Sequence, residues 1–441
     1  MHLSQRVALN TIIQIVTKLI TVCFGLALTI LLTSFLGRDG YGSYMYILTL
    51  VTIFGSFADW GTATIGVREA SSLKEKQDKI LVNVFFLRLA LAVFGSLLLI
   101  GTAFWLPFGR ADNLIIRQGI LIGSIILILF AVKASFGLIF QTKMQMQKLA
   151  IADILASASI FAISWFLVQA RSSLLPLIWA VLAANVAAVF IAGFLAFKTI
   201  SFRQQIDLSF LKKFLLQSLP MGAVLLMFSI DNKIDTVMLG AIKGNEAVGI
   251  YALAYRVYDV LILGAAYLMS SLLPVISQYA NQDDWRNKFK IVYQKTFDVL
   301  LMMGVVILIF VFLAAPFIVK FLTMSRFQEF FPAVSVLKIL SLAIFLSYFN
   351  HLTGYTLISL KKQNPYFFIA FFALIFNIVL NLIIIPRFSY WGAATVTMLT
   401  EMIVLIITSI FIYRTIGVVP SLFGFPKTLI QIIKQKGKFF K

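Results

Sequence analysis

The sequence contains few charged residues, one cysteine and two histidines. Charged residues make up 12% of the 441 residues, whereas an average soluble domain has about 25%. The single cysteine, Cys23, excludes an intramolecular disulfide, and His2 and His351 are too few for a transition-metal site. No nucleotide-binding loop or nucleophilic triad is present. We therefore expect no enzyme activity, no metal and no cofactor.

Most of the sequence consists of long apolar segments. Hydrophobic residues make up 61% of the chain, and about 20 apolar residues suffice for one helix across a bilayer. The runs are continuous and do not alternate with period two, so they predict helices and not the strands of a barrel. The sequence predicts an all-α polytopic membrane protein. Its twelve predicted spans are 9–36, 41–65, 81–106, 118–140, 150–170, 175–197, 214–240, 248–275, 296–319, 332–359, 365–386 and 391–413.

The net charge of +20 does not indicate a nucleic-acid partner, because the basic residues lie in the loops and no nucleic-acid-binding motif is present. Twelve spans put both termini on one side of the membrane. Twenty-three basic residues fall on that side and eight on the other. The positive-inside rule then predicts cytoplasmic termini for a protein of the inner or plasma membrane.

A weak internal repeat divides the chain. Leu36-Gly-Arg-Asp-Gly-Tyr-Gly-Ser-Tyr44 resembles the later series Leu239-Gly240, Lys243-Gly244 and Val248-Gly-Ile-Tyr251, and Gly42 and Gly249 lie 207 residues apart. The repeat predicts two six-helix bundles, related by a pseudo-twofold axis along the membrane normal. We expect bundles at 1–197 and 214–414, a cytoplasmic connector at 198–213, and a basic cytoplasmic tail at 415–441.

The repeated turns also carry a family resemblance. Residues 36–44 lead into Phe57-Ala-Asp-Trp-Gly61 and Val67-Arg-Glu69, a series that resembles the first two spans of the polysaccharide-biosynthesis membrane proteins, the Wzx-type O-antigen flippases. The resemblance continues in Asp231-Asn-Lys-Ile-Asp-Thr-Val-Met-Leu-Gly240, in 248–256 and in 377–395. It implies membership of the multidrug/oligosaccharidyl-lipid/polysaccharide flippase superfamily. It also implies transport of a polyprenyl-diphosphate-linked oligosaccharide from the cytoplasmic to the outer leaflet.

Such a cargo requires a polar, cationic cavity, because an unsolvated diphosphate and glycan would cost many kcal/mol in hydrocarbon. Lys18 is one candidate, since Asn10, Gln14 and Lys18 follow at helical spacing on one face of the first span. Arg256 and Arg88 are the other candidates, because arginine can bind a diphosphate bidentately. The alternative for Lys18 and Arg88 is a side chain that snorkels to the interface.

Acidic and amide side chains within the spans have two readings. The seventh and eighth spans contain three aspartates near Arg256, namely Asp231, Asp235 and Asp259. They either form structural ion pairs or bind H⁺ or Na⁺ to couple transport to an ion gradient. Structural or gating roles are predicted for five further residues, some of them at span ends and the asparagines as contacts between helices: Asp59, Arg68, Asn377, Asn381 and Glu401.

Three rival functions stay open at this point. An ion-coupled multidrug exporter of the same superfamily would favour acidic groups, because many drugs are cations. A lipid II flippase usually has fourteen spans, and this chain has room for twelve. A membrane polysaccharide polymerase or ligase would normally have a large outer loop, which the sequence lacks. The expected partners are the lipid-linked oligosaccharide, membrane lipids, H⁺ or Na⁺, and other polysaccharide assembly proteins.

Overall fold

The computed structural model describes residues 3–105, 113–279, 285–360, 362–417 and 419–421. Helices make up almost all of these ranges and no β-strand occurs in them, which confirms the predicted all-α class. Ten helices in the described ranges are long and apolar enough to cross a membrane. Two of them bend, at Gly37 and at Ser389. Because each bent helix covers two predicted spans, the ten helices overlap all twelve predicted segments.

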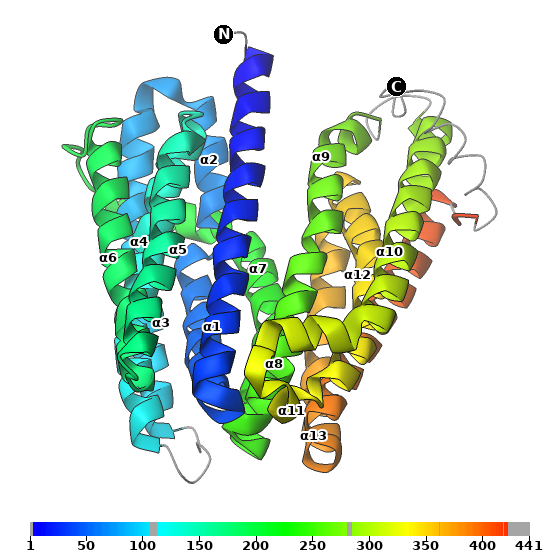
Figure 1. Ribbon diagram of the computed structural model, residues 1–441. Helices are drawn as coiled ribbons and strands as arrows, with labels where there is room; N and C mark the ends of the chain where they lie inside the picture. Colours follow the sequence, from blue (N-terminus) through cyan, green and yellow to red (C-terminus); the bar gives the residue numbers. More distant parts are fainter. Residues whose placement is uncertain (1–2, 106–112, 280–284, 361, 418, 422–441) are drawn as a thin grey trace. The chain divides into compact units, whose positions relative to one another are not determined.

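The chain forms two compact units. Unit 1 comprises residues 1–249 and Phe321–Glu329. Within it, α1 packs against α3, α4, α5 and α7, and α6 packs against α4 and α5. Figure 1 shows α1 in blue, with the turn that Gly37 introduces. The helices are α1 (Leu3–Asp59), α2 (Thr62–Ser72), α3 (Gln77–Trp105), α4 (Asn113–Thr142), α5 (Met146–Gln169), α6 (Leu174–Phe197) and α7 (Leu208–Lys243).

Unit 2 comprises residues 250–320 and 330–441. In this unit α12 packs against α9 and α13. The predicted bundles at 1–197 and 214–414, and the pseudo-twofold axis between them, stay predictions. The helices that follow α7 are α8 (Asn245–Leu261), α9 (Leu263–Tyr279), α10 (Trp285–Thr323), α11 (Phe327–Phe330), α12 (Ala333–Ser359) and α13 (Gln363–Ile416).

The bends explain where helix boundaries differ from the predicted spans. Gly37 has φ 67°, a left-handed conformation that glycine adopts without steric cost, and it turns α1 between the first two predicted spans. The predicted span 41–65 covers the end of α1 and the start of α2, which Trp60 (φ 38°) and Gly61 (φ 69°) separate. Apolar periodicity does not report such a break, since the residues on both sides of it remain apolar.

Candidate functional site

Arg88 lies buried in unit 1 and is held by three side chains. Only 3% of the residue is exposed. Its Nε donates to Ser135 Oγ at 2.9 Å, and its Nη1 donates to Asp59 Oδ1 at 2.5 Å and to Thr62 Oγ1 at 3.1 Å. Asp59 also accepts a hydrogen bond from the backbone N–H of Ala63, in the first turn of α2. The pair therefore joins α3 to the break between α1 and α2, and the cavity role predicted for Arg88 would require these bonds to exchange.

Two of the other basic side chains within the spans are also engaged. Lys133 on α4 pairs with Asp153 on α5 at 2.9 Å, and its side chain is 18% exposed. Lys338 on α12 lies over the ring of Phe312, with Nζ 4.9 Å from the ring centre. A buried or membrane-embedded cation is costly unless it is paired or stacked. Lys133 has a carboxylate partner and Lys338 an aromatic ring, so both charges are stabilised within the spans.

Lys18 lacks such a partner. It is exposed on the first half of α1, as is Gln14 one turn before it, and no described residue forms a hydrogen bond or ion pair with its ammonium group. Asn10, the third member of the predicted polar stripe, is buried. Its Nδ2 donates to the backbone oxygen of Met144 at 3.0 Å, and its Oδ1 accepts from Met146 N–H at 2.9 Å. Asn10 thus caps the start of α5, whereas Gln14 and Lys18 stay available.

Arg256 on α8 of unit 2 is the second cation without a partner. It is partly buried, and its Nε lies buried with no hydrogen-bond acceptor. Among the described residues no carboxylate pairs with its guanidinium, Asp259 three residues later included. A buried N–H without an acceptor costs about 1–3 kcal/mol. An anion that enters from outside the chain would remove this cost.

The acidic candidates differ in burial. Asp235 on α7 is 1% exposed, and Asp231 and Asp259 are partly buried. The structure brings Asn377 and Asn381 together in a buried hydrogen bond of 2.8 Å within α13. Arg68 is exposed and contacts its neighbour Glu69 at 3.3 Å, as expected for a charge pair at a helix end.

A polar cluster around Glu401 was not predicted as a unit. Glu401 on α13 accepts from the Tyr258 hydroxyl at 2.7 Å and from Asn350 Nδ2 at 2.6 Å. These residues come from α13, α8 and α12, and no sequence spacing relates them. The two donors satisfy both oxygens of a carboxylate, so the cluster holds the three helices of unit 2 together.

The repeated glycines meet in unit 1. A Cβ added to Gly42 would lie 1.8 Å from the backbone oxygen of Asn245, and one added to Gly249 would lie 2.0 Å from that of Arg38. A salt bridge of 3.0 Å joins Arg38 to Glu246 beside them. The two series of the repeat therefore pack backbone against backbone.

Arg326 also holds a turn in unit 1, a role that the sequence did not suggest. Its Nε donates to the backbone oxygen of Ser34 at 2.8 Å, and its Nη1 pairs with Glu329 at 2.7 Å. Thr33 Oγ1 donates to Leu322 O at 2.7 Å. The carbonyls at the end of the first half of α1 are thus capped by a cation, which the helix dipole favours. Only the position of Arg326 in a short loop near a helix end could have pointed to this.

Comparisons with known proteins agree with this architecture. A family model described as polysaccharide biosynthesis protein matches residues 7–280, and one described as MatE matches 220–383. No curated protein matches the chain.

Solved structures of transporters have the same fold. An inward-facing multidrug resistance MATE family transporter of the MOP superfamily aligns with TM-score 0.77 and 15% identity, over 92% of this chain and 98% of that one. The lipid II flippase MurJ in an inward closed conformation aligns with TM-score 0.71 and 16% identity, over 98% of both chains. A MOP superfamily transporter from Pyrococcus furiosus Vc1 (DSM3638), with a binding pocket of reverse polarity, aligns with TM-score 0.62 and 16% identity, over 94% of this chain and 96% of that one. Because the first family model covers more than half of the sequence, the chain belongs to the polysaccharide biosynthesis protein family, and it folds like the transporters of the MOP superfamily.

Proposed function

We propose that the protein is a flippase that moves a polyprenyl-diphosphate-linked oligosaccharide to the outer leaflet by alternating access, for polysaccharide or O-antigen biosynthesis. The observation that carries the proposal is the state of the cations within the spans. Arg88 and Lys133 are paired with carboxylates, whereas Lys18 and Arg256 have no acidic partner among the described residues. A diphosphate is the anion that such a cargo presents, and arginine and lysine are its usual ligands.

Export of the glycan tests these two residues. Lys18→Ala and Arg256→Ala should each abolish export while protein levels stay normal. Arg256→Lys should restore part of the activity, since lysine keeps the charge but loses the bidentate geometry. Lys212→Ala is the matched control, because Lys212 is an exposed cation to which no role in transport is assigned. Normal export in both alanine variants would contradict the proposal.

Energy coupling forms the second part of the proposal. Alternating access needs a ligand that binds one conformation better than the other. Asp231, Asp235 and Asp259 are the proposed sites for H⁺ or Na⁺, and each Asp→Asn change should weaken transport but spare binding of the lipid-linked sugar. Reconstituted transport that responds to neither a pH nor a Na⁺ gradient would leave these aspartates a structural role.

The membrane orientation follows from the same proposal. Both termini and the 66–80, 198–213 and 278–295 loops are proposed to face the cytoplasm of a cell whose inner or plasma membrane holds the protein. Cysteines introduced there, with Cys23 replaced, should resist an impermeant reagent added outside, and one at Lys243 should react. Labelling of the 278–295 loop in intact cells would reverse the orientation.

Export of a cationic drug is the rival activity, and Asp235 is the observation that favours it, since a buried carboxylate prefers a cation. The same Lys18→Ala and Arg256→Ala variants separate the two functions. Removal of a cation should raise drug export or leave it unchanged, whereas it should abolish export of an anionic lipid. We propose no catalytic role for any residue.

A further inference from the structure

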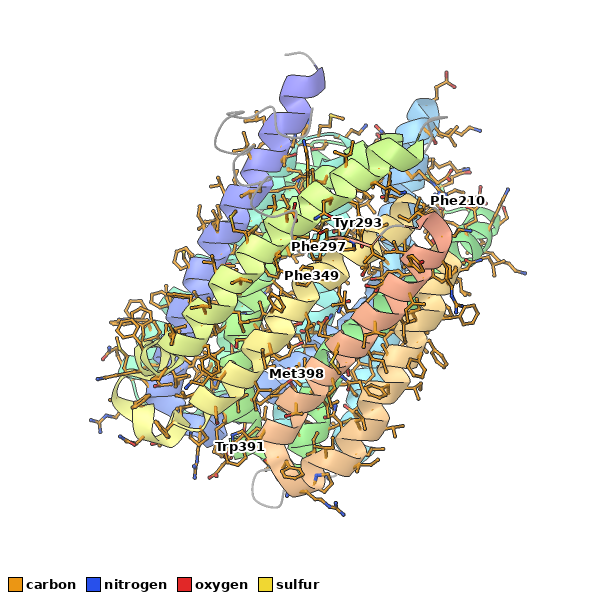
Figure 2. The ribbon with its side chains drawn as sticks, turned by 90° about the vertical axis from the view of Figure 1, so that its right-hand side faces the viewer. Phe210, Tyr293, Phe297, Phe349, Trp391 and Met398 are labelled. Atoms are coloured by element: carbon orange, nitrogen blue, oxygen red, sulfur yellow. The ribbon has the colours of Figure 1, made fainter. Side chains whose placement is uncertain are left out.

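Unit 2 contains an apolar pocket that the proposed transport cycle does not use. It lies between α10, α12 and α13, and its volume is about 250 Å³. We call it the lateral pocket. In Figure 2, Tyr293, Phe297 and Phe349 lie close together between the yellow-green ribbon of α10 and the salmon ribbon of the second half of α13. Its main lining residues are Tyr293, Phe297, Leu301, Phe345, Phe349 and Leu352.

The lining offers almost nothing to a polar ligand. The hydroxyl of Thr353 already donates to the Asn350 carbonyl at 3.2 Å and accepts from Thr408 at 2.9 Å. The phenyl rings of Phe297 and Phe349 pack at 5.1 Å between centres. Water needs two to four polar partners to occupy a cavity, and apolar cavities stay dry. Hydrocarbon therefore fits this lining better than water or a polar ligand does.

The pocket is large enough to hold only part of a lipid-sized ligand. Pockets that enclose a drug-sized ligand measure about 300–1,000 Å³, so 250 Å³ accommodates a length of alkyl chain whose remainder lies outside. Ser409 lines the pocket and is exposed, so the pocket reaches the surface at this residue. Exposed Ile406 and Ile410 lie on either side of Ser409 along α13, as expected for a helix face in contact with lipid.

Positive charge lies one turn beyond the aromatic lining. On α10, Lys290 precedes Tyr293 by three residues and Phe297 by seven, so the three side chains share a face. Lys290 is exposed and has no partner among the described residues. Between 285 and 297 the sequence has four basic residues and no acidic one; Asp283 and Asp284, which come before, lie outside the described residues. Asp298 accepts from Gln294 at 2.8 Å.

We propose that the lateral pocket binds an anionic phospholipid, with one acyl chain between α10, α12 and α13 and the phosphate at Lys290. Basic residues beside a groove between membrane helices are a typical lipid headgroup site. The arrangement supplies both parts of such a ligand: hydrocarbon-lined space within the membrane, and a cation one turn further along α10. This site is separate from Lys18 and Arg256, so the proposal does not depend on the transported cargo.

Native mass spectrometry of the whole protein tests the proposal. The protein is taken from vesicles of phosphatidylcholine that contain a minor fraction of phosphatidylglycerol, and the retained lipid is identified. We expect phosphatidylglycerol to be enriched. Lys290→Gln should reduce the preference for it about fivefold, the effect of one basic residue at a membrane surface. Ser409→Phe should remove the retained lipid, because the ring fills the pocket.

Two variants serve as matched controls. Lys320→Gln removes an exposed lysine at the other end of α10, and Ile410→Phe adds a ring one residue away from the pocket. Both should retain phosphatidylglycerol as the wild type does. Equal retention by Ser409→Phe and the wild type, with both folded by gel filtration, would overturn the proposal. So would recovery of a polyprenyl phosphate in place of phospholipid from native membranes, or a gain of lipid when 422–441 are removed, since the chain's own tail would then be the occupant.

Discussion

Replacing Gly42 with alanine should disrupt the contact between the two series of the internal repeat. The added Cβ would lie 1.8 Å from the backbone oxygen of Asn245 and 2.8 Å from the backbone nitrogen of Gly249, where ordinary contact begins at 3.4 Å. Both clashes involve backbone, so no side-chain rotation relieves them. The start of α8 has to move away from α1 in unit 1.

The expected loss of folding free energy in Gly42→Ala comes from the disrupted packing between α1 and the start of α8. Overpacking a well-packed region costs about 1–3 kcal/mol and occasionally more, and a backbone clash belongs at the upper end of that range. Gly101→Ala is the matched control. Gly101 lies in α3 with nothing within 4 Å of the added Cβ, so alanine there should stabilise by about 0.5–1 kcal/mol through helix propensity. Thermal unfolding in detergent, followed by the fraction that remains monodisperse, measures both variants.

The double variant sharpens the test. Gly249→Ala alone should be as damaging as Gly42→Ala, because its Cβ would lie 2.0 Å from the backbone oxygen of Arg38. Once one methyl group has separated the helices, the second meets less resistance. The double variant should therefore lose less stability than the sum of the two single changes. Gly42→Ala with the stability of Gly101→Ala would refute the close contact.

Three further changes test other contacts. Asp59→Asn should destabilise unit 1 by up to about 3 kcal/mol, the lower end of the cost of breaking a buried ion pair, because the Asp59 side chain is 38% exposed. A stabilised Asp59→Asn variant would contradict the ion pair with Arg88. Arg326→Ala should cost about 1.5–3 kcal/mol, measured by the same thermal assay. Hydrogen bonds from Ser209 and Phe210, with one from Lys79, lower the pKa of Asp207. The Asp207 carboxylate therefore adds to the free energy of unfolding above its unfolded pKa of about 3.9, and this stabilisation is lost as the pH falls through the lower folded pKa. The loss of stability in Asp207→Asn should be constant near pH 7 and should fade below about pH 4.

The sequence predicts the helices well because length and apolarity act locally. It predicts the neighbours of a side chain poorly. Asn10, Gln14 and Lys18 do share a helical face, yet Asn10 caps α5 at Met144 and Met146. Helical periodicity gives the face of a residue and not the helix that this face meets.

Polar contacts over long sequence separations show the same limit. Arg88 and Asp59 are 29 residues apart and Tyr258 and Glu401 are 143 apart. Their pairing depends on tertiary packing that no local pattern encodes. Gly42 and Gly249 share a sequence context and do meet, but the repeat predicted two related bundles and not this contact. Glycine at a matching position is informative because only glycine permits so close an approach of two backbones.

The cations without partners set the strongest constraint on mechanism. The chain supplies Asp59 for Arg88, Asp153 for Lys133 and an aromatic ring for Lys338, so its fold can stabilise a cation within the spans. Lys18 in unit 1 and Arg256 in unit 2 lack this stabilisation among the described residues. An anion from outside the chain would stabilise either cation, and a ligand favours the conformation that binds it more tightly. The double variant Lys18→Ala/Arg256→Ala should therefore export no less glycan than either single variant, because each single change already removes a cation that binding of the cargo requires. Separate, multiplying losses would show that the two cations act at independent steps.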